Sequence, residues 1–245
     1  FRRHSAMGNQ THRKGGDIMT KKHVAVVMGG WSPERDISLI SGEGCAKALE
    51  ASNYQVSRID AGRNLAEQLQ TVNPDVVFNA LHGLGGEDGV VQGVFELLEI
   101  PYTHSGVMAS ALAMDKIQAK KIFAEAGLSV APDMKVFAGD ISDHPMVPPY
   151  VVKPINQGSS VGIEIVKDAT QTVPAILKNS EWPLMVEAFV PGRELSCAVW
   201  KGKSSEVMEI RASNDFYDFD AKYTEGGSTH IVPADISADI RSEIR

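Results

Sequence analysis

The sequence predicts an α/β unit with a parallel sheet, followed by an α+β part with antiparallel sheets. In the first part, short apolar runs alternate with stretches of helical spacing, which is typical of strand–helix–strand units. In the later part, strand-like runs follow one another with only turn residues between them, which favours antiparallel pairing. The composition, with 43% hydrophobic and 22% charged residues, is that of a globular chain.

Length, charge and cysteine content exclude several classes of protein. The 245 residues suffice for one or two domains, or three small ones, around an apolar core. No apolar run approaches the ~20 residues of a membrane-spanning helix. The net charge of −7 argues against nucleic-acid binding, which needs basic patches. Cys45 lies in a helix-like stretch and Cys197 in a strand-like stretch, with no CxxC pair, so we expect a reduced, cytoplasmic setting.

The first eighteen residues differ from the rest of the chain. Residues 1–18 are polar and basic, without apolar periodicity and without the apolar stretch of a secretory signal. Met19 is followed after a few polar residues by an apolar run (TKKHVAVVM), as a natural start is. We interpret residues 1–18 as a leader or tag outside the fold; a basic arm for an acidic partner is the alternative.

The first part of the fold begins at residues 23–28 (HVAVVM), a β-branched run that ends in two glycines and suits a buried parallel strand. Apolar residues at helical spacing from Ile37 to Leu49 predict the helix that follows. We therefore predict a small doubly wound unit over residues 19–105. Its remaining elements are a strand over 54–60, a strand over 75–81, a helix over 91–98 and a short strand from 100.

The later part begins with a helix over residues 115–126, which carries Ala119, Ile122 and Phe123 on one face and ends before Gly127. Residues 141–150 are rich in proline and polar side chains, which indicates a loop. Short strands in quick succession follow, and we expect them to form antiparallel sheets. The strand-like runs are residues 149–154, 162–167, 183–190 and 194–200.

A loop rich in glycine and serine lies between two of these strand-like arms. Gly158, Ser159, Ser160 and Gly162 allow backbone N–H groups to approach an anion, and the hydroxyl groups add donors. Lys153, at the mouth of the first arm, supplies a mobile positive charge for phosphate. By itself this pattern fits a polar hairpin turn about as well as a phosphate site.

Two other phosphate-binding motifs are excluded. The chain has no GxxxxGK[ST], so it is not a P-loop NTPase. The glycine cluster at residues 82–89 (HGLGGEDG) does not fit GxGxxG, because Asp88 occupies the third glycine position, and Glu87 and Asp88 would repel a pyrophosphate. This loop nevertheless follows a strand end, where ligands bind in open α/β sheets.

Several charged residues allow two interpretations from position alone. Glu34 follows the first strand and could bind an ammonium group or merely favour a helix start. Glu187 and Glu194 flank a linker, where carboxylates can accept from ribose hydroxyls or stay exposed at strand ends. Residues 216–223 (FYDFDAKY) fit a lid or a surface loop, and Lys116 alone fits a solvated lysine.

Taken together, these motifs resemble the D-alanine–D-alanine ligase family of the ATP-grasp superfamily, from about Lys22 to the end of the chain. The resemblance implies two ATP-grasp domains with antiparallel sheets, a central one over 106–188 and the start of a C-terminal one over 189–245. The matching stretches are VMGGWSPERDISLISG, ALHGLGGEDGVVQGVFELLEIPYTHSGVMASALAMDK, VVKPINQGSSVGI, VEAFVPGREL and FYDFDAKY.

The activity that this resemblance implies is the ATP-dependent joining of two D-alanine molecules for peptidoglycan synthesis. A carboxylate is a poor electrophile, so ATP first converts it to an acyl phosphate, which the amine of the second D-alanine attacks. The resemblance also implies a cytoplasmic homodimer whose partner is D-alanine, rather than a nucleic acid or a membrane. A D-alanine–D-lactate ligase of the same fold is the alternative; such enzymes carry histidine in place of the lid tyrosine, so Tyr223 favours the dipeptide maker.

The resemblance further implies roles for individual residues. Glu34 holds the ammonium of the first D-alanine, His82 lies near its carboxylate, and hydrogen bonds link Tyr223 of the lid, Ser159 and Glu34 at the catalytic centre. ATP is bound by residues in the second half of the chain. These are Lys116 and Lys153 on the phosphates; Gly158, Ser159 and Ser160 in the loop above them; Glu187, Ala188, Val190 and Glu194 around the adenosine; and Phe216 and Lys222 in the lid.

The metal-binding residues of the family have no counterpart in this sequence. Its Asp, its Glu-x-Asn and its oxyanion-stabilising Arg are not found after Tyr223, and Asp235, Asp239 and Glu243 have the spacing of a solvated helix. We therefore expect an incomplete C-terminal domain, with the ligands of Mg²⁺ or Mn²⁺ beyond residue 245. An inactive nucleotide-binding fragment is the corresponding alternative for the chain as it stands.

Overall fold

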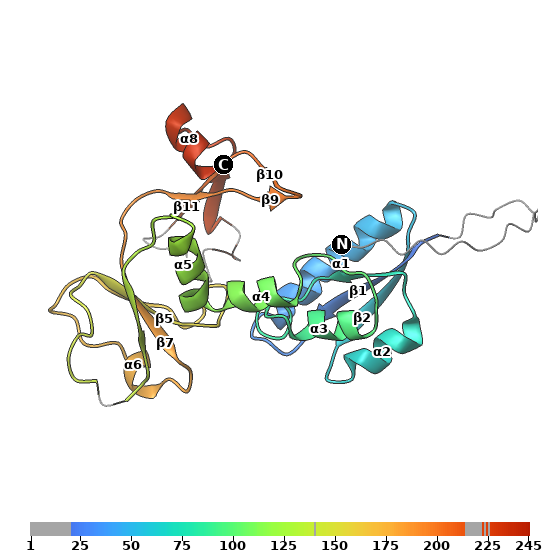
Figure 1. The fold of residues 1–245 in the computed structure, drawn as a ribbon, viewed down its shortest axis with the longest axis horizontal. Helices are drawn as coiled ribbons and strands as arrows, with labels where there is room; N and C mark the ends of the chain where they lie inside the picture. The colour runs from blue at the N-terminus through green and yellow to red at the C-terminus, as the bar shows by residue number, and fades with distance from the viewer. Residues whose placement is uncertain (1–20, 140, 214–221, 223, 225) are drawn as a thin grey trace, which may run out of the picture.

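The computed structural model describes residues 21–245 with the exceptions of 140, 214–221, 223 and 225 (Figure 1). It confirms the predicted fold class, because a parallel sheet in the first part of the chain is followed by antiparallel sheets. Residues 1–18 lie outside the described residues, and so do Phe216 and Tyr223 of the predicted lid. Among the helices described, none is both long enough and apolar enough to cross a bilayer.

The N-terminal sheet has the strand order β2-β1-β3, and both strand pairs are parallel. β1 is the central strand, and it is apolar because both faces of a doubly wound sheet are covered. The strands are β1 (His23–Gly29), β2 (Gln55–Ala61) and β3 (Val76–Asn79).

Helices cover both faces of this sheet. The even-numbered residues of β1, such as Val24 and Val26, pack with Ala46 of α1, whereas Ala25 and Val27 pack on the other face with side chains of α2 and α3. Figure 1 shows α1 on one side of β1 and α2 and α3 on the other. The helices are α1 (Arg35–Ala51), α2 (Leu65–Val72) and α3 (Val90–Leu97).

The short strand predicted from residue 100 does not form at full length. It is reduced to one parallel bridge between Val77 and Tyr102. Glu99 and His104 on either side have positive φ angles of 54° and 78°, which turn the backbone away from an extended course. The pairing of this segment with β3 is therefore confined to the residues between Glu99 and His104.

Two helices join the N-terminal sheet to the central sheet: α4 (Val107–Met114) and α5 (Lys116–Glu125) (Figure 1). The side chain of Asp115 caps α5 by accepting from the backbone N–H of Gln118 at 3.0 Å. The helix predicted over 115–126 is thus confirmed. Its apolar face stays nearly half exposed, however, at 43% for Ile122 and 47% for Phe123.

The central sheet is antiparallel throughout and has the order β4-β7-β5-β6. Its apolar face packs with Leu177 of α6 into a second core that includes Tyr150 and Val186. Residues paired across neighbouring strands share a face, so the register places Asp133, Glu187 and Val151 together on the opposite side. The elements are β4 (Asp133–Val136), β5 (Tyr150–Pro154), β6 (Glu164–Val166), α6 (Ile176–Asn179) and β7 (Leu184–Ala188).

A third sheet, of order β12-β11-β8, follows in the last part of the chain together with a two-stranded hairpin of β9 and β10. These two sheets are antiparallel as well. The elements are β8 (Glu194–Ser196), β9 (Val199–Trp200), β10 (Lys203–Ser204), β11 (Met208–Ala212), β12 (Ser228–Ile231) and α8 (Ala238–Ile244).

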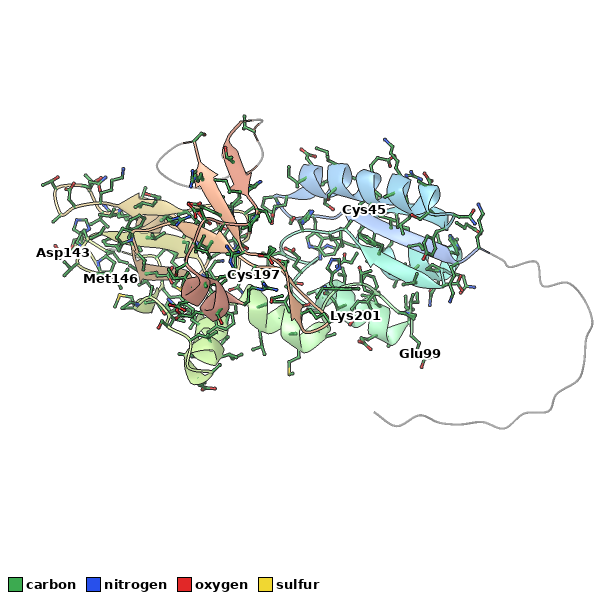
Figure 2. The ribbon with its side chains drawn as sticks, turned by 90° about the horizontal axis from the view of Figure 1, so that it is seen from above. Cys45, Glu99, Asp143, Met146, Cys197 and Lys201 are labelled. Carbon is green, nitrogen blue, oxygen red and sulfur yellow. The ribbon has the colours of Figure 1, made fainter. Side chains whose placement is uncertain are left out.

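The run 194–200, predicted as one strand, divides into β8 and β9. Both backbone groups of Ala198 bond to Ser205, its N–H to the Ser205 hydroxyl at 3.0 Å and its carbonyl to the Ser205 N–H at 2.8 Å. These bonds turn the chain into the hairpin, so Cys197 lies between strands rather than within one. Cys45 and Cys197 are both free thiols, and Figure 2 shows them in different parts of the molecule.

Candidate active site

A cavity of about 450 Å³ brings together residues that the sequence singled out over more than a hundred positions. It lies between the start of α5, the end of β5 and the glycine–serine loop. Three lysines converge on it, and their positive charge makes it suitable for an anion. Its lining includes Lys116, Lys153, Gly158, Ser159, Ser160 and Lys222.

Lys153 projects from β5 on the charged face of the central sheet. Its Nζ donates to Oε2 of Glu187 at 2.6 Å, and the two side chains are only 20% and 17% exposed. Burial acts to raise the pKa of Glu187, but hydrogen bonds from Lys120 and Lys153 outweigh it and hold that pKa below its ordinary value. Glu187 is therefore an ionised carboxylate beside the cavity.

Lys116, at the first turn of α5, is not a solvated surface lysine. Its Nζ donates to the carbonyl oxygens of Ile155 at 3.1 Å and Gln157 at 2.6 Å. The ammonium group therefore lies at the start of the glycine–serine loop. Burial, together with the nearby charge of Lys153, lowers the pKa of Lys116 to about 8. Its charge is thus sensitive to pH just above neutrality.

The glycine–serine loop is tightly turned. Ser159 and Ser160 both have positive φ angles, 47° and 61°, a conformation that costs a non-glycine residue about 1 kcal/mol or more. Such outliers cluster at ligand sites. The Oγ of Ser160 accepts from Nζ of Lys222 at 2.9 Å, so a residue of the predicted lid reaches the loop. Burial lowers the pKa of Lys222, against the opposing effect of the carboxylates of Glu194 and Glu34.

Glu34 is 4% exposed, although it carries a carboxylate. It occupies the N-cap position of α1 but its side chain makes no capping bond there. Instead its Oε1 accepts a hydrogen bond from the hydroxyl of Ser159, 125 positions further along the chain. Of the two interpretations from position, the structure therefore favours a carboxylate directed to the cleft.

Glycines make room for the Glu34 carboxylate. A Cβ at Gly83 would meet its Oε2 at 2.4 Å, and one at Gly158 would meet it at 2.9 Å, both inside ordinary contact distance. Gly83 also has a φ of 68°. The loop after β3 and the glycine–serine loop therefore close around Glu34 at backbone level.

His82 lies at the edge of a second cavity of about 390 Å³. Its Nε2 is 3.0 Å from the hydroxyl of Ser41, and its backbone carbonyl accepts from the hydroxyl of Ser32 at 2.7 Å. Glu87 lines both cavities, which places them next to one another. Glu34 and His82 follow the carboxyl ends of adjacent parallel strands, where ligands bind in open α/β sheets.

The residues expected around adenosine lie at the end of β7 and beyond it. The N–H of Ala188 already donates to the carbonyl of Pro132 at 2.9 Å, so Ala188 can offer a ligand only its own carbonyl. Val190 is 69% exposed, and Glu194 is exposed at the start of β8.

Lys120 is a residue that the sequence reasoning missed. Its Nζ contacts the carbonyl of Ala131 at 2.6 Å, Oδ2 of Asp133 at 2.8 Å and Oε1 of Glu187, and the side chain is 13% exposed. The available signal was its spacing: Lys120 lies four positions after Lys116, one turn along the same face of α5. The partners come from β4 and β7, which sequence alone does not place beside it.

A divalent cation has no evident site among the residues described. Within them, no group of three or more histidine, cysteine or carboxylate side chains could hold a metal ion. Glu87, which lines the first cavity, accepts from the backbone N–H of Gly83 at 2.8 Å, and the nearby Glu187 and Glu34 are engaged by lysines and by Ser159 respectively. The described residues therefore do not fit such a cation.

Family models match two parts of the chain. One, described as "D-ala D-ala ligase N-terminus", covers residues 58–105, and another, "D-ala D-ala ligase C-terminus", covers residues 122–245. Relatives named D-alanine–D-alanine ligase are similar over most of the chain. That of Parvibaculum lavamentivorans is 54% identical over 91% of this chain and 74% of its own length, and that of Agrobacterium fabrum is 53% identical over 93% and 76%.

Solved structures show the same similarity. The D-alanine–D-alanine ligase of Bacillus anthracis matches with a TM-score of 0.73 and 29% identity, over 90% of this chain and 74% of that one. Its complex with ATP matches with a TM-score of 0.74 and 25% identity, over 90% and 73%. In these comparisons, therefore, this chain spans about three quarters of the length of its relatives.

Proposed function

This chain belongs to the D-alanine–D-alanine ligase family, and from that premise we propose that its first cavity binds ATP and its Glu34 loop binds D-alanine. It is an ATP-dependent ligase that joins two D-alanine molecules into D-alanyl-D-alanine, the dipeptide used in peptidoglycan. The observation that carries the assignment of the site is the convergence of three lysines and a glycine–serine loop on one cavity, whose Ser159 donates to the Glu34 carboxylate.

The chemistry gives each group of residues a task. A carboxylate cannot expel an oxide at neutral pH, so it needs activation as an acyl phosphate. Phosphoryl transfer depends mainly on positioning and on neutralised charge. We assign this task to Lys116 and Lys153, with backbone and hydroxyl donors from Gly158, Ser159 and Ser160. These groups surround one cavity from two different elements, as an extended triphosphate requires.

Adenosine is assigned to the neighbouring strand end. The ionised Glu187 can accept from an amino group of the base, and Glu194 can accept from ribose hydroxyls. The carbonyl of Ala188 and the backbone of Val190 complete this part, while Phe216 is a proposal outside the described residues. Lys222 contacts Ser160, and we assign it to the phosphates as a residue of the lid.

The first D-alanine is assigned to the loops after β1 and β3. The buried Glu34 carboxylate offers an ammonium group an oxygen close to the hydroxyl of Ser159. His82 lies on the adjacent loop, where it can approach the carboxylate of the same molecule. Tyr223 is proposed as the lid residue that completes this set. Closure over an acyl phosphate would keep water from it.

Mg²⁺ as the companion of ATP, a homodimeric state, a cytoplasmic location and domain limits near residues 105 and 188 are further proposals that rest on the family resemblance. Mg²⁺ shields the charge of a triphosphate and helps to neutralise it during transfer. Because the described residues do not form a site for it, we assign it no step and no ligand.

The test is an assay of phosphate release with ATP, with and without D-alanine, in which the dipeptide is identified by mass spectrometry. We expect release to require both substrates. Glu34→Gln should raise the KM for D-alanine about tenfold or more, because a hydrogen bond between charged groups contributes ~1.5–3 kcal/mol. Asp36→Asn, an exposed carboxylate two positions away, is the matched control and should leave the KM unchanged.

Phosphate release that is independent of D-alanine, or equal KM values in the Glu34→Gln protein and the wild type, would contradict this assignment.

A further inference from the structure

Lys120 makes a closed set of contacts beside the nucleotide cavity. An ammonium group has three N–H donors, and Lys120 has three acceptors: the Ala131 carbonyl, Asp133 and Glu187. The residue does not line the cavity, and 13% of its side chain is exposed. It is thus equipped to hold protein groups rather than to bind a ligand.

Glu187 is shared between two lysines. Its Oε1 accepts from Lys120, on α5, and its Oε2 accepts from Lys153, on β5. The two lysines differ in position: Lys153 lines the cavity, whereas Lys120 lies behind the carboxylate. Of the two lysines, therefore, only Lys153 can release Glu187 and bind a phosphate oxygen in the cavity instead.

The strand register makes a second cation necessary. Asp133 and Glu187 are direct partners across β4 and β7, and like charges that face one another in this way are destabilising. Their two negative charges are balanced by Lys120 and Lys153. Without Lys120, Lys153 alone would balance the negative charges of Asp133 and Glu187. Its ammonium group would then stay bound to the protein instead of reaching a phosphate.

We propose that Lys120 is a positioning residue of the nucleotide site, which keeps Glu187 compensated and in place so that Lys153 is available to the phosphates of ATP. The proposal rests on the proposed function of Lys153 and Glu187. Burial acts to lower the pKa of Lys120, but its hydrogen bonds to Asp133 and Glu187 outweigh burial and raise that pKa, which agrees with a permanent cation at this place.

The test uses Lys120→Gln, which keeps donors for Ala131 and Asp133 but lacks the charge. Binding of ATP and of inorganic triphosphate is measured by isothermal titration calorimetry. We expect both affinities to fall roughly tenfold, since one charge-assisted bond to phosphate is weakened. The KM for ATP should rise likewise, while the KM for D-alanine stays the same. Lys121→Gln, at the exposed neighbouring position of α5, is the matched control.

Two double variants separate positioning from general electrostatics. Lys120→Gln/Glu187→Gln removes the carboxylate that would retain Lys153, so affinity for inorganic triphosphate should return to within about threefold of the wild type. Lys120→Gln/Asp133→Asn has the same net charge but leaves Glu187 on Lys153, so affinity should stay low.

Equal recovery in both double variants, or a Lys120→Gln protein that binds triphosphate as the wild type does, would overturn the proposal. A parallel rise of the KM for D-alanine would also overturn it, because that indicates a general structural defect. Wild-type protein that fails to bind ATP would instead refute the proposed function itself.

Discussion

The parallel sheet and the central antiparallel sheet use their strands differently. β1 is apolar and buried along nearly its whole length, and its functional neighbours, Glu34 and His82, lie on loops beyond the strand ends. The central sheet has an apolar face, but its other face carries Lys153 and Glu187 on the strands themselves. The comparison teaches that strand residues of the first sheet serve stability, whereas those of the second can serve ligand binding.

The largest effect should come from the core of the parallel sheet. Phe95 of α3 is fully buried and its ring lies 5.3 Å from that of Tyr102. Phe95→Ala should lower the free energy of unfolding by about 3–5 kcal/mol, because it removes a large side chain and leaves a cavity. Leu97→Ala, on the same helix but 82% exposed, should change it by less than ~0.5 kcal/mol. Denaturant titration would measure both, and equal losses would break the comparison.

A smaller effect, of opposite sign for binding and for stability, should come from Lys116. Its pKa of about 8 means that the ammonium loses its proton as the pH rises through that value. ATP affinity should then fall above pH 8, by at most about tenfold per pH unit. The unfolded chain retains the proton up to its ordinary pKa of 10.5, so the free energy of unfolding should rise over the same range.

Calorimetry with ATP and denaturant titration between pH 7 and 9 would measure the two trends. Lys116→Arg, which stays charged, is the control and should show a flatter dependence of ATP affinity on pH. An ATP affinity of the wild type that is constant over this range would show that Lys116 does not act through its charge.

Sequence patterns predicted the strands of the parallel sheet well, because a buried strand such as β1 consists of a nearly continuous apolar run. They did not reveal α4, whose sequence VMASALAM is apolar or small all round and therefore lacks a helical period. They also passed over β4, a four-residue strand with two charged residues, in which only Val136 packs against the core while Asp133 faces Lys120. Short elements in polar surroundings carry little periodicity.

The residues of the site also differ in whether the sequence could predict them. Lys153 and the glycine–serine loop could be predicted because they are contiguous in sequence, and the long motifs carried the family resemblance. The contact between Ser159 and Glu34 was implied by that resemblance alone, since 125 positions separate the two residues. Lys120 could not be predicted, because an isolated helical lysine resembles any surface lysine until β4 and β7 bring Asp133 and Glu187 to it.

The most direct test of the division between the two sheets is Lys153→Met, with ATP affinity and the free energy of unfolding measured on the same preparation. Lys120 alone then balances Asp133 and Glu187 in this variant, and Glu187 keeps one of its two cations, so the free energy of unfolding should fall by about 1–3 kcal/mol. ATP affinity should fall roughly 10- to 150-fold, the equivalent of ~1.5–3 kcal/mol for a lost charge-assisted contact. Unchanged ATP affinity in a variant that the same denaturant titration shows to be folded would contradict the assignment of the charged face of the central sheet to nucleotide binding.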